Sequence, residues 1–475
     1  MTSAQLARAR SIWCMPDPNL IGPDLIGSGM KVQIRRESVN WIYLFIPFWP
    51  ERRMARLGVF CYPGTGHLNP MTALARRLQE RGHSVVIFGI ADVESRVKAA
   101  GIEFCLIGES DFPPGTLKKL DRHHSELKGL KVFHFTIERI KNTARMVLRD
   151  GPDAVRRSEV EALLVDESDF GGNVAEYLGL PFVSVACIPP LIRGDQYPPF
   201  CFGWGAGLDW RSRLRNQFGI RLLTRVANPV FAAINEQRKA WGLGPQTAAG
   251  GFLSPLLRVT QLPRILEFDV GDPPSLVKYT GPFVDQQQRT RVEFPWERLD
   301  GRPLVYASLG TMQNGSETIF RTIAAACAGL HVQLVISLGG GLDEKRLGVL
   351  AGDPVVVRFA PQLEIVKRAS AVITHAGLNT VLESLAEGLP LVCIPLGNDQ
   401  PGVAARVAAR GAGIVVPRRK LNAAQLRSAV KAILEDGKYR RAARVIQAAI
   451  QAVDGLEQAS DLIEDALKIK VRIPA

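Results

Sequence analysis

The sequence predicts an α/β fold in which two doubly wound, Rossmann-like domains face each other across a cleft. With 475 residues, the chain is too long for one ordinary hydrophobic core. Short apolar runs typical of buried strands alternate with helical segments, which indicates parallel sheets covered by helices on both faces. Because this alternation occurs as two successive series of similar size, we expect a ligand-binding cleft between two domains.

The first series covers residues 54–283. An apolar strand begins abruptly after Met54, whereas residues 1–53 have no clear periodicity. We interpret residues 1–53 as a poorly ordered extension or a mis-called start, and we expect them to be dispensable. The expected strands are Leu57–Tyr62, Ser84–Phe88, Ala162–Asp166 and Phe182–Cys187, and the expected helices are Pro70–Arg81 and Gly171–Leu178.

The second series covers residues 301–455, after a polar, turn-like linker at 284–300. Its expected strands are Leu304–Ser308, Val332–Ser337, Val355–Phe359, Ala371–Thr374 and Leu391–Ile394. A last helix at about Leu456–Ile469, within the segment 456–475, lies beyond this series and is placed to pack back on the first domain.

Composition narrows the class of protein. The net charge is +13, but the basic residues are scattered and form no zinc-finger pattern or Lys/Arg tract, so we expect an arginine-rich solvated surface and no nucleic-acid partner. The seven cysteines are far apart and include no CxxC pair, which is typical of reduced core residues in a cytoplasmic protein.

No apolar run is long enough to span a bilayer. The longest early run, Trp41–Trp49, is short and is broken by Pro47, and no small-residue cleavage site follows it. This run could still act as a weak interfacial anchor, which would allow peripheral association with a membrane surface.

The most informative stretch begins where a strand is expected to end at His375. A turn containing Gly377 follows, and a helix begins near Asn379. A helix N-terminus offers unpaired N–H groups and a partial positive charge, which suit a diphosphate. His375, Asn379 and Thr380 can add hydrogen-bond donors there.

Carboxylates and amides follow at useful positions. Glu383 is four residues from Asn379, hence on the same helix face, where it can accept hydrogen bonds from a ribose diol. Asp399 and Gln400 follow the next strand and suit the vicinal hydroxyls of a sugar. Each of these motifs alone is more often structural, but their ordered combination favours a nucleotide-sugar site.

From Met54 to its end, the chain resembles the inverting UDP-glycosyltransferase family, which includes plant secondary-product, macrolide and zeaxanthin glucosyltransferases. The resemblance rests on Phe359-Ala-Pro-Gln362, on the stretch from Thr374 to Glu383, and on Asp399-Gln400. It implies the GT-B architecture, with the acceptor on the N-terminal domain and the nucleotide sugar on the C-terminal domain. By this resemblance, Phe359 and Gln362 would hold the base of the nucleotide, and Glu383 would hold its ribose. The phosphates would be held by His375, Gly377, Asn379 and Thr380, and the sugar by Asp399 and Gln400. Ser308 and Thr311 match the loop that lies near the diphosphate.

Two positions depart from the family pattern. Phe359 and Leu378 stand where the plant members have tryptophan, and the spacing before His375 is slightly shorter. Both departures resemble bacterial members and leave uridine and thymidine open as the nucleoside.

The loop Gly66-His67-Leu-Asn-Pro70 resembles the catalytic loop of the family, which makes His67 the expected general base. Such a histidine needs a carboxylate to fix its tautomer. Asp166 matches the partner position, Asp169 is its competitor, and an Asx turn is the structural alternative for Asp166. Gly64-Thr-Gly66 lacks the third glycine of a dinucleotide fingerprint, which argues against a nicotinamide enzyme.

The resemblance therefore implies an inverting transferase that moves a hexose, with glucose as the default, from a UDP-sugar or TDP-sugar to a hydroxyl group. No cofactor or metal is expected, because no Asp-x-Asp pair stands out and His123, His124 and His134 fit a solvated helix. Alternatives are a non-catalytic GT-B-like helper protein and a sugar-nucleotide epimerase.

The acceptor is the least specified partner. The stretch Pro189–Trp210 is rich in proline and aromatic residues, either as a structural loop or as the wall of an apolar pocket. The pocket interpretation predicts a small lipophilic acceptor such as a terpenoid, carotenoid, polyketide or flavonoid.

Overall fold

The computed structural model describes residues 54–127, 130–192, 194–246, 252–285, 292–311 and 314–469. The interpretation of residues 1–53, including the apolar run Trp41–Trp49, therefore lies outside the described residues, as do 286–291 of the linker and 470–475 at the C-terminus.

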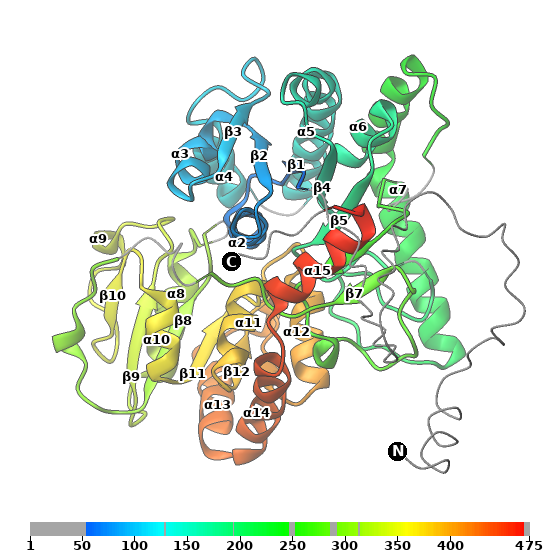
Figure 1. Ribbon diagram of the computed structural model, residues 1–475. Coiled ribbons are helices and arrows are strands. Elements are labelled where there is room, and N and C mark those ends of the chain that lie inside the picture. The colour runs from blue at the N-terminus through cyan, green and yellow to red at the C-terminus, as the bar shows by residue number, and fades with distance from the viewer. Residues whose placement is uncertain are drawn as a thin grey trace, which may run out of the picture. The chain divides into compact units, whose positions relative to one another are not determined.

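The first domain is organised by a parallel sheet (Figure 1). Among the described residues its strand order is β3-β2-β1-β4-β5-β6-β7. The direction in which strands are added reverses between β1 and β4, which makes this the topological switch point. The strands are β1 (Arg56–Phe60), β2 (Ser84–Gly89), β3 (Glu103–Leu106), β4 (Ala162–Asp166), β5 (Phe182–Ala186), β6 (Arg258–Thr260) and β7 (Val277–Tyr279).

Helices cover both faces of this sheet because its strands are apolar on both sides. On β1, Leu57 and Val59 face one core, whereas Phe60 faces the other. The first core packs on α2 (Thr65–Glu80), α3 (Ala91–Ala99) and α15 (Gly455–Leu467). The second core packs on α5 (Leu130–Arg157), α6 (Gly171–Leu178) and α7 (Trp210–Ala240), with α4 (Thr116–Glu126) against α5.

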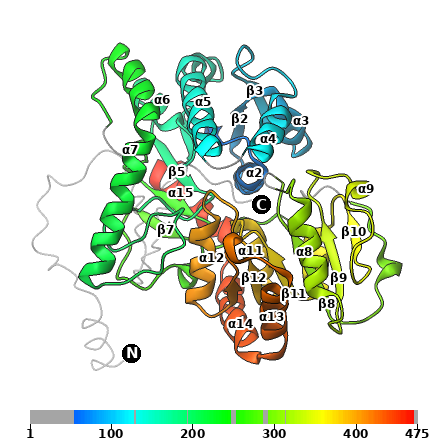
Figure 2. The same ribbon diagram turned by 180° about the vertical axis from the view of Figure 1, so that it is seen from behind.

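The last helix, α15, returns from the second domain to the first and packs against α2 (Figures 1 and 2). Leu456, Ala459 and Ile463 join the core beside β1, and Arg81 Nε donates to Glu464 Oε1 at 2.8 Å. The chain crosses in the other direction as well, because Leu262 and Leu266 (in η3, Arg264–Leu266) pack into the core of the second domain.

The second domain repeats the doubly wound plan. Its described strands have the order β10-β9-β8-β11-β12-β13, all parallel, with the switch point between β8 and β11. The strands are β8 (Leu304–Ser308), β9 (Gln333–Ser337), β10 (Val355–Val357), β11 (Ala369–Thr374), β12 (Leu391–Cys393) and β13 (Gly413–Val415).

The helices of the second domain also form two layers. One layer contains α8 (Glu317–Cys327), α9 (Glu344–Leu347) and α13 (Ala423–Glu435), and the other contains α10 (Gln362–Arg368), α11 (Leu378–Ala386), α12 (Gln400–Ala409) and α14 (Gly437–Gln451). Two short 3-10 helices, η4 (Trp296–Arg298) and η5 (Arg418–Lys420), complete the described elements. Within the expected linker, Phe294 packs into the core of this domain.

The predicted fold class is confirmed, and most predicted strands agree with the structure within one or two residues. One helix differs in a way that matters for function. The sequence places Pro70 at a helix start, but α2 begins at Thr65 and contains Pro70 in its interior. His67 therefore lies in the first turn of a helix and not in a loop before it.

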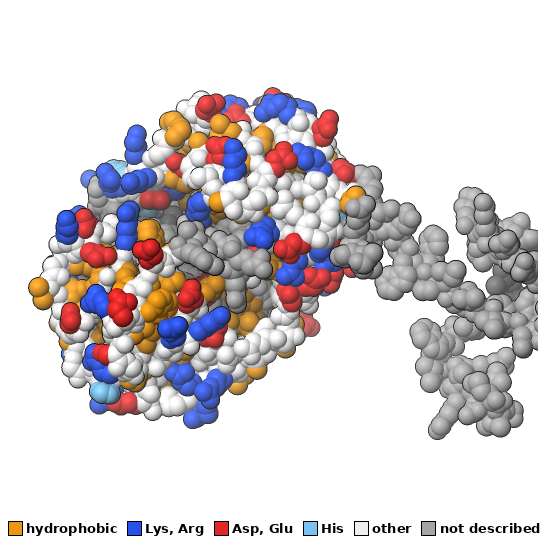
Figure 3. Space-filling model, turned by 60° about the vertical axis from the view of Figure 1, so that its left-hand side comes forward, with side chains coloured by type: hydrophobic (Ala, Val, Ile, Leu, Met, Phe, Trp, Pro, Cys, Tyr) orange, Lys and Arg blue, Asp and Glu red, His pale blue; other side chains and the backbone are white. Residues whose placement is uncertain are grey.

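The surface has no single-sign character on the face drawn in Figure 3, where basic and acidic side chains are interspersed. In the described part of the chain, no helix is both long and apolar enough to cross a membrane. The six cysteines among the described residues are free thiols, four of them buried.

Candidate active site

A cavity of about 650 Å³ lies between the two domains and is lined by residues of both. The carboxyl ends of strands at the two switch points open toward it, as is usual for doubly wound sheets. It takes in all the predicted site residues except Asp166: His67, Ser308, Thr311, Phe359, Gln362, His375, Gly377, Asn379, Thr380, Glu383, Asp399 and Gln400. Asp166 is fully buried.

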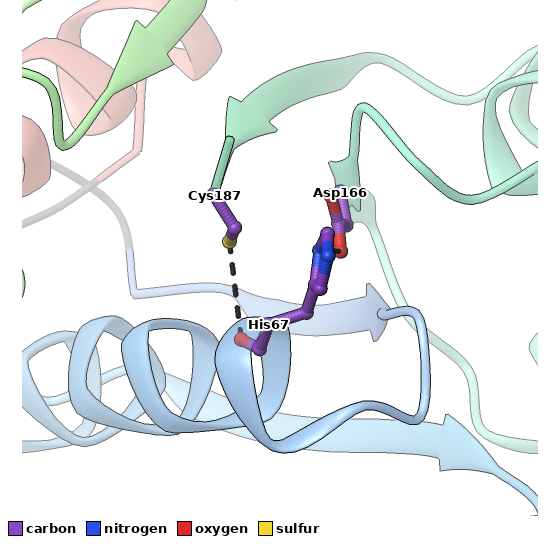
Figure 4. Close-up of side chains that lie close together, drawn as sticks. All are labelled: His67, Asp166 and Cys187. Atoms are coloured by element: carbon purple, nitrogen blue, oxygen red, sulfur yellow. Dashed lines mark hydrogen bonds and ion pairs between the residues drawn. The ribbon is translucent and has the colours of Figure 1, made fainter. Parts of the chain in front are cut away.

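His67 and Asp166 form a tight pair (Figure 4). His67 Nδ1 lies 2.7 Å from Asp166 Oδ2. Because an ionised carboxylate only accepts hydrogen bonds, Nδ1 carries the hydrogen and Nε2 is left as the basic nitrogen. Asp166 is fixed in turn by the backbone, since Tyr62 N donates to Oδ2 at 3.3 Å and Ser168 N donates to Oδ1 at 3.0 Å. The predicted alternatives thus coexist, because Asp166 closes an Asx turn and also binds His67.

The pair changes the basicity of His67. Burial lowers the pKa of His67, but the adjacent Asp166 charge and hydrogen bond outweigh burial, so that the pKa is raised above its ordinary value. Asp399 and Asp169 add smaller effects in the same direction. A histidine with these surroundings is a stronger base than one in water.

Asp169, the competitor for the partner role, has a different environment. Its Oδ1 accepts from the backbone N–H groups of Phe170 at 2.6 Å and Gly171 at 3.0 Å, at the start of α6. Burial, followed by the charge of Asp166, raises the pKa of Asp169 to about 7. Asp169 thus organises the turn, whereas Asp166 contacts the imidazole.

Cys187, which follows β5, completes a group of possible metal ligands. Its Sγ donates to the carbonyl oxygen of His67 at 3.8 Å (Figure 4), and ligand atoms of His67, Asp166 and Cys187 lie within 4.8 Å of one another. Burial raises the pKa of the Cys187 thiol well above its ordinary value. A metal ion bound through His67 Nδ1 would replace the hydrogen bond between His67 and Asp166.

His375 lies at the end of β11, beside the β8 strand end. Burial lowers the pKa of His375 to about 4, which keeps it neutral near pH 7. Two glycines make room for its ring. A Cβ at Gly310, where φ is +72°, would lie 2.6 Å from His375 Cε1, and a Cβ at Gly377 would lie 2.5 Å from Nε2. Only glycine fits at either position with the ring in place.

A polar network joins the residues expected to hold the nucleoside. Gln362 Nε2 donates to Glu383 Oε2 at 2.5 Å, and the Tyr306 hydroxyl donates to Gln362 Oε1 at 3.1 Å. The half-exposed ring of Phe359 lies over Gly340, where a Cβ would lie 2.7 Å from the ring. Tyr306 and Gly340 could not be predicted from the sequence, because a buried tyrosine and a turn glycine have many structural uses.

Asn379 is oriented differently from the expectation that it faces a phosphate. Its Nδ2 donates to the carbonyl oxygen of Gly66 at 3.0 Å, and its Oδ1 accepts from Gln261 Nε2 at 2.9 Å. Pro70 explains the first contact. Proline has no N–H, so the carbonyl four residues earlier, that of Gly66, has no helical partner and is free to accept from Asn379. Asn379 therefore links the donor helix α11 to the turn that carries His67.

The remaining predicted donor residues flank the same space. Gln400 Oε1 accepts from the N–H groups of Leu396 and Gly397 at 2.8 and 3.0 Å, which holds the loop before α12. Burial raises the pKa of Asp399, an effect that the nearby His67 charge opposes. Ser308 Oγ accepts from Gly310 N at 3.3 Å, and Thr311 lies on the cavity wall.

The first-domain half of the cavity is largely apolar, but its wall differs from the prediction. Of the aromatic residues in Pro189–Trp210, Phe200 alone lines the cavity, while Tyr197 packs with Phe268 and Val270 in a separate cluster. The wall is supplied mainly by α5, the turn before α6, and α7, through residues that were not predicted from the sequence: Phe135, Ile137, Ile140, Phe170, Ala227, Val230 and Phe231.

Of the three histidines expected on a solvated helix, one differs from that expectation. His124 is buried and lines the cavity, in place of the solvated position that the polar run predicts, whereas His123 and His134 are exposed. His124 is covered by the ring of Phe135, on which it stacks with 6.0 Å between the two ring centroids. Burial, followed by the Arg139 charge, lowers the pKa of His124.

Comparisons with known proteins agree with this geometry. Residues 297–457 match the family described as UDP-glucoronosyl and UDP-glucosyl transferase, and residues 60–165 match the glycosyltransferase family 28 N-terminal domain. The chain is 29% identical over 417 residues to a zeaxanthin glucosyltransferase of Pantoea ananas, covering 87% of this chain and 96% of the relative. It is 28% identical over 422 residues to a 4'-demethylrebeccamycin synthase of Lentzea aerocolonigenes, covering 86% of this chain and 99% of the relative.

A solved structure shows the same fold. The glycosyltransferase of kitacinnamycin superposes with a TM-score of 0.68 at 22% identity, covering 88% of this chain and 100% of that chain. The two parallel-sheet domains are thus those of the GT-B fold.

Proposed function

Because the chain belongs to the UDP-glycosyltransferase family and is a nucleotide-sugar glycosyltransferase, we propose that it moves a hexose, with glucose as the first candidate, from a UDP-sugar or TDP-sugar to a hydroxyl group of a small lipophilic acceptor. The configuration at C1 is inverted in this reaction. The observation that carries the proposal is the His67–Asp166 pair at 2.7 Å, placed where a largely apolar half-cavity meets a polar one.

In the proposed reaction, His67 Nε2 takes the proton of the acceptor hydroxyl as its oxygen attacks C1 of the sugar. The new C1–O bond forms on one face of the sugar while the bond from C1 to the diphosphate oxygen breaks on the other. Asp166 stabilises the resulting imidazolium and keeps Nδ1 protonated. The nucleoside diphosphate leaves with the additional negative charge.

The donor half of the cavity supports a UDP-sugar or TDP-sugar as the donor. The N-terminus of α11 offers backbone N–H groups beside the neutral His375, an arrangement that suits a diphosphate. Glu383 and Gln362 would hold the nucleoside, and Asp399 with Gln400 would face the sugar. Because donors of this kind can meet the diphosphate charge, we further propose that transfer needs no metal ion, so that a chelator would leave the rate unchanged.

The acceptor half supports a lipophilic alcohol or phenol. Aromatic and aliphatic side chains of α5 and α7 line it, and few charged groups reach it. Relatives named for zeaxanthin and 4'-demethylrebeccamycin favour a carotenoid, another terpenoid, a polyketide or a flavonoid over a free sugar or a protein. A sugar-nucleotide epimerase would not need such a wall.

The test is a matrix of UDP- and TDP-hexoses against lipophilic alcohols, free sugars and peptides, with nucleotide release and glycoside mass both measured. The proposal expects glycosides of lipophilic acceptors, with the anomeric coupling constant showing inversion. If free sugars were glycosylated efficiently and lipophilic alcohols were not, a lipophilic acceptor would be refuted. Retention at C1 would refute the mechanism.

A further inference from the structure

The first turns of α7 expose a strip of large apolar side chains. Trp210, Leu214, Phe218 and Leu222 are 69%, 56%, 64% and 42% exposed. Their spacing of four residues places them along one side of the helix. We call these four residues the α7 strip. Scattered apolar residues are usual on a protein surface, but a contiguous row of this size marks an interaction surface.

Basic side chains accompany the strip. Arg211, Arg213, Arg221 and Arg225 are exposed on the same turns, and the only acid of α7 is Glu236, near its far end. None of these four arginines forms an ion pair with another residue in the described parts of the chain. At 100° per residue, Arg221 and Arg225 fall between the apolar positions, so that the face is both apolar and cationic.

The face is held outward by the opposite side of the helix. Asn216 is buried and its Nδ2 donates to the carbonyl oxygen of Asp195 at 2.8 Å. Gly219 is packed so closely that a Cβ there would lie 2.8 Å from the Trp204 ring. These contacts prevent α7 from rotating to bury the strip, and both ribbon views place α7 at the outer edge of its domain (Figures 1 and 2).

We propose that the α7 strip docks this protein on an anionic phospholipid bilayer. Aromatic and aliphatic side chains enter the interface, while the arginines meet phosphate groups, as in interfacial amphipathic helices. A second copy is a poorer occupant, because a two-fold interface would place these arginines against their own equivalents. Nucleic acid would use the charge but would leave a row of four large apolar side chains in water.

The same helix leads to the cavity. Val230 and Phe231 of α7 line the cavity, and about 16 residues separate Leu214 from Val230, which is about 24 Å along a helix. Docking would therefore bring the apolar half of the cavity near the bilayer, where a lipophilic acceptor dissolves. This last step rests on the proposed function, whereas the docking itself does not.

The test is flotation of the full-length protein with phosphatidylcholine vesicles and with vesicles containing phosphatidylcholine and phosphatidylglycerol at about 7:3. We expect binding to the anionic vesicles that weakens with salt. Arg221→Gln combined with Arg225→Gln should weaken it roughly 25-fold, because each arginine near an anionic surface contributes about a fivefold change in partitioning. Trp210→Ser combined with Phe218→Ser should weaken it at least tenfold.

Matched controls lie elsewhere on the surface. Arg418→Gln with Arg419→Gln removes the same charge, and Val349→Ser with Val445→Ser removes exposed apolar groups; both pairs should bind as the wild type does. Thermal unfolding of each variant checks that it is folded. Equal binding to neutral and anionic vesicles, or unchanged binding of the α7 variants, would overturn the proposal. The proposal would also be overturned if the variants of the α7 strip abolished a dimer, or a complex with duplex DNA, while their binding to vesicles persisted. No glycosyl transfer is measured, so failure here is distinct from failure of the proposed function.

Discussion

Replacing Asp166 with asparagine removes the charge of the catalytic pair and keeps its shape. In the wild type, Oδ2 accepts from His67 Nδ1 and Tyr62 N, while Oδ1 accepts from Ser168 N. An asparagine has only one acceptor oxygen. We expect that oxygen to face His67 and Tyr62, because this orientation keeps the hydrogen bonds at Oδ2 and loses only the one from Ser168 N, whereas the flipped amide would keep only the one from Ser168 N.

The magnitude follows from that orientation. Because the His67 tautomer is preserved, the variant exchanges a hydrogen bond to a charged carboxylate for one to a neutral amide. The transition state therefore loses about 1–2 kcal/mol of stabilisation. This corresponds to a decrease of kcat/KM of roughly 5- to 30-fold above the acid limb. The sign of the pH effect is also set. Without the Asp166 charge, burial dominates and the pKa of His67 falls, so that the acid limb moves to lower pH.

The assay is kcat/KM for the acceptor between pH 5 and 9 at saturating donor. The wild type should lose activity as pH falls through the raised pKa of His67, above the ordinary value of about 6.5, because the base must be neutral. Asp169→Asn is the control, since Asp169 binds backbone N–H groups and not the imidazole. An acid limb that stays in place in Asp166→Asn, or one that moves only in Asp169→Asn, would refute the assigned pair.

Three further changes probe the two halves of the cavity. His375→Ala should weaken UDP or TDP binding by about 1.5–3 kcal/mol in calorimetry, and unchanged affinity of the variant would remove His375 from the donor site. Because the pKa of His375 is about 4, titration of this group should not make the wild-type affinity vary between pH 6 and 8. Gly310→Ala should weaken the same binding, since its Cβ would displace the His375 ring and φ is +72°; full affinity in a folded variant would contradict the close packing. Phe135→Ala should raise KM for a lipophilic acceptor and leave the donor Kd unchanged, and the reverse pattern would place the acceptor elsewhere.

The fold and the donor half of the cavity could be predicted because their signals are local. A strand that ends at Asp166 or His375 shows in a short run of apolar residues followed by a glycine-containing turn. The topology then carries such strand ends to the switch points without further information. The predicted residues are brought to one cavity for this reason, although their roles remain predictions.

The acceptor wall could not be predicted, because it depends on how long helices pack. Phe135 and Phe231 lie in amphipathic segments whose buried faces look the same whether they meet a core or a cavity. The aromatic stretch around Tyr197 was a misleading signal, since Phe200 alone of its aromatic residues lines the cavity and Tyr197 packs with Phe268 and Val270 instead. The contact of Asn379 with Gly66 needed the position of Pro70 inside α2, which the sequence alone placed at a helix start.

The most direct test of the account is the turnover of His67→Ala beside its affinity for the donor. With a donor and acceptor identified by the screen, glycoside formation is followed by mass spectrometry at saturating donor, and the donor Kd is measured by calorimetry. We expect kcat to fall by about 10²- to 10⁴-fold while the donor Kd is nearly unchanged. Turnover close to that of the wild type would contradict His67 as the base, and with it the proposed mechanism.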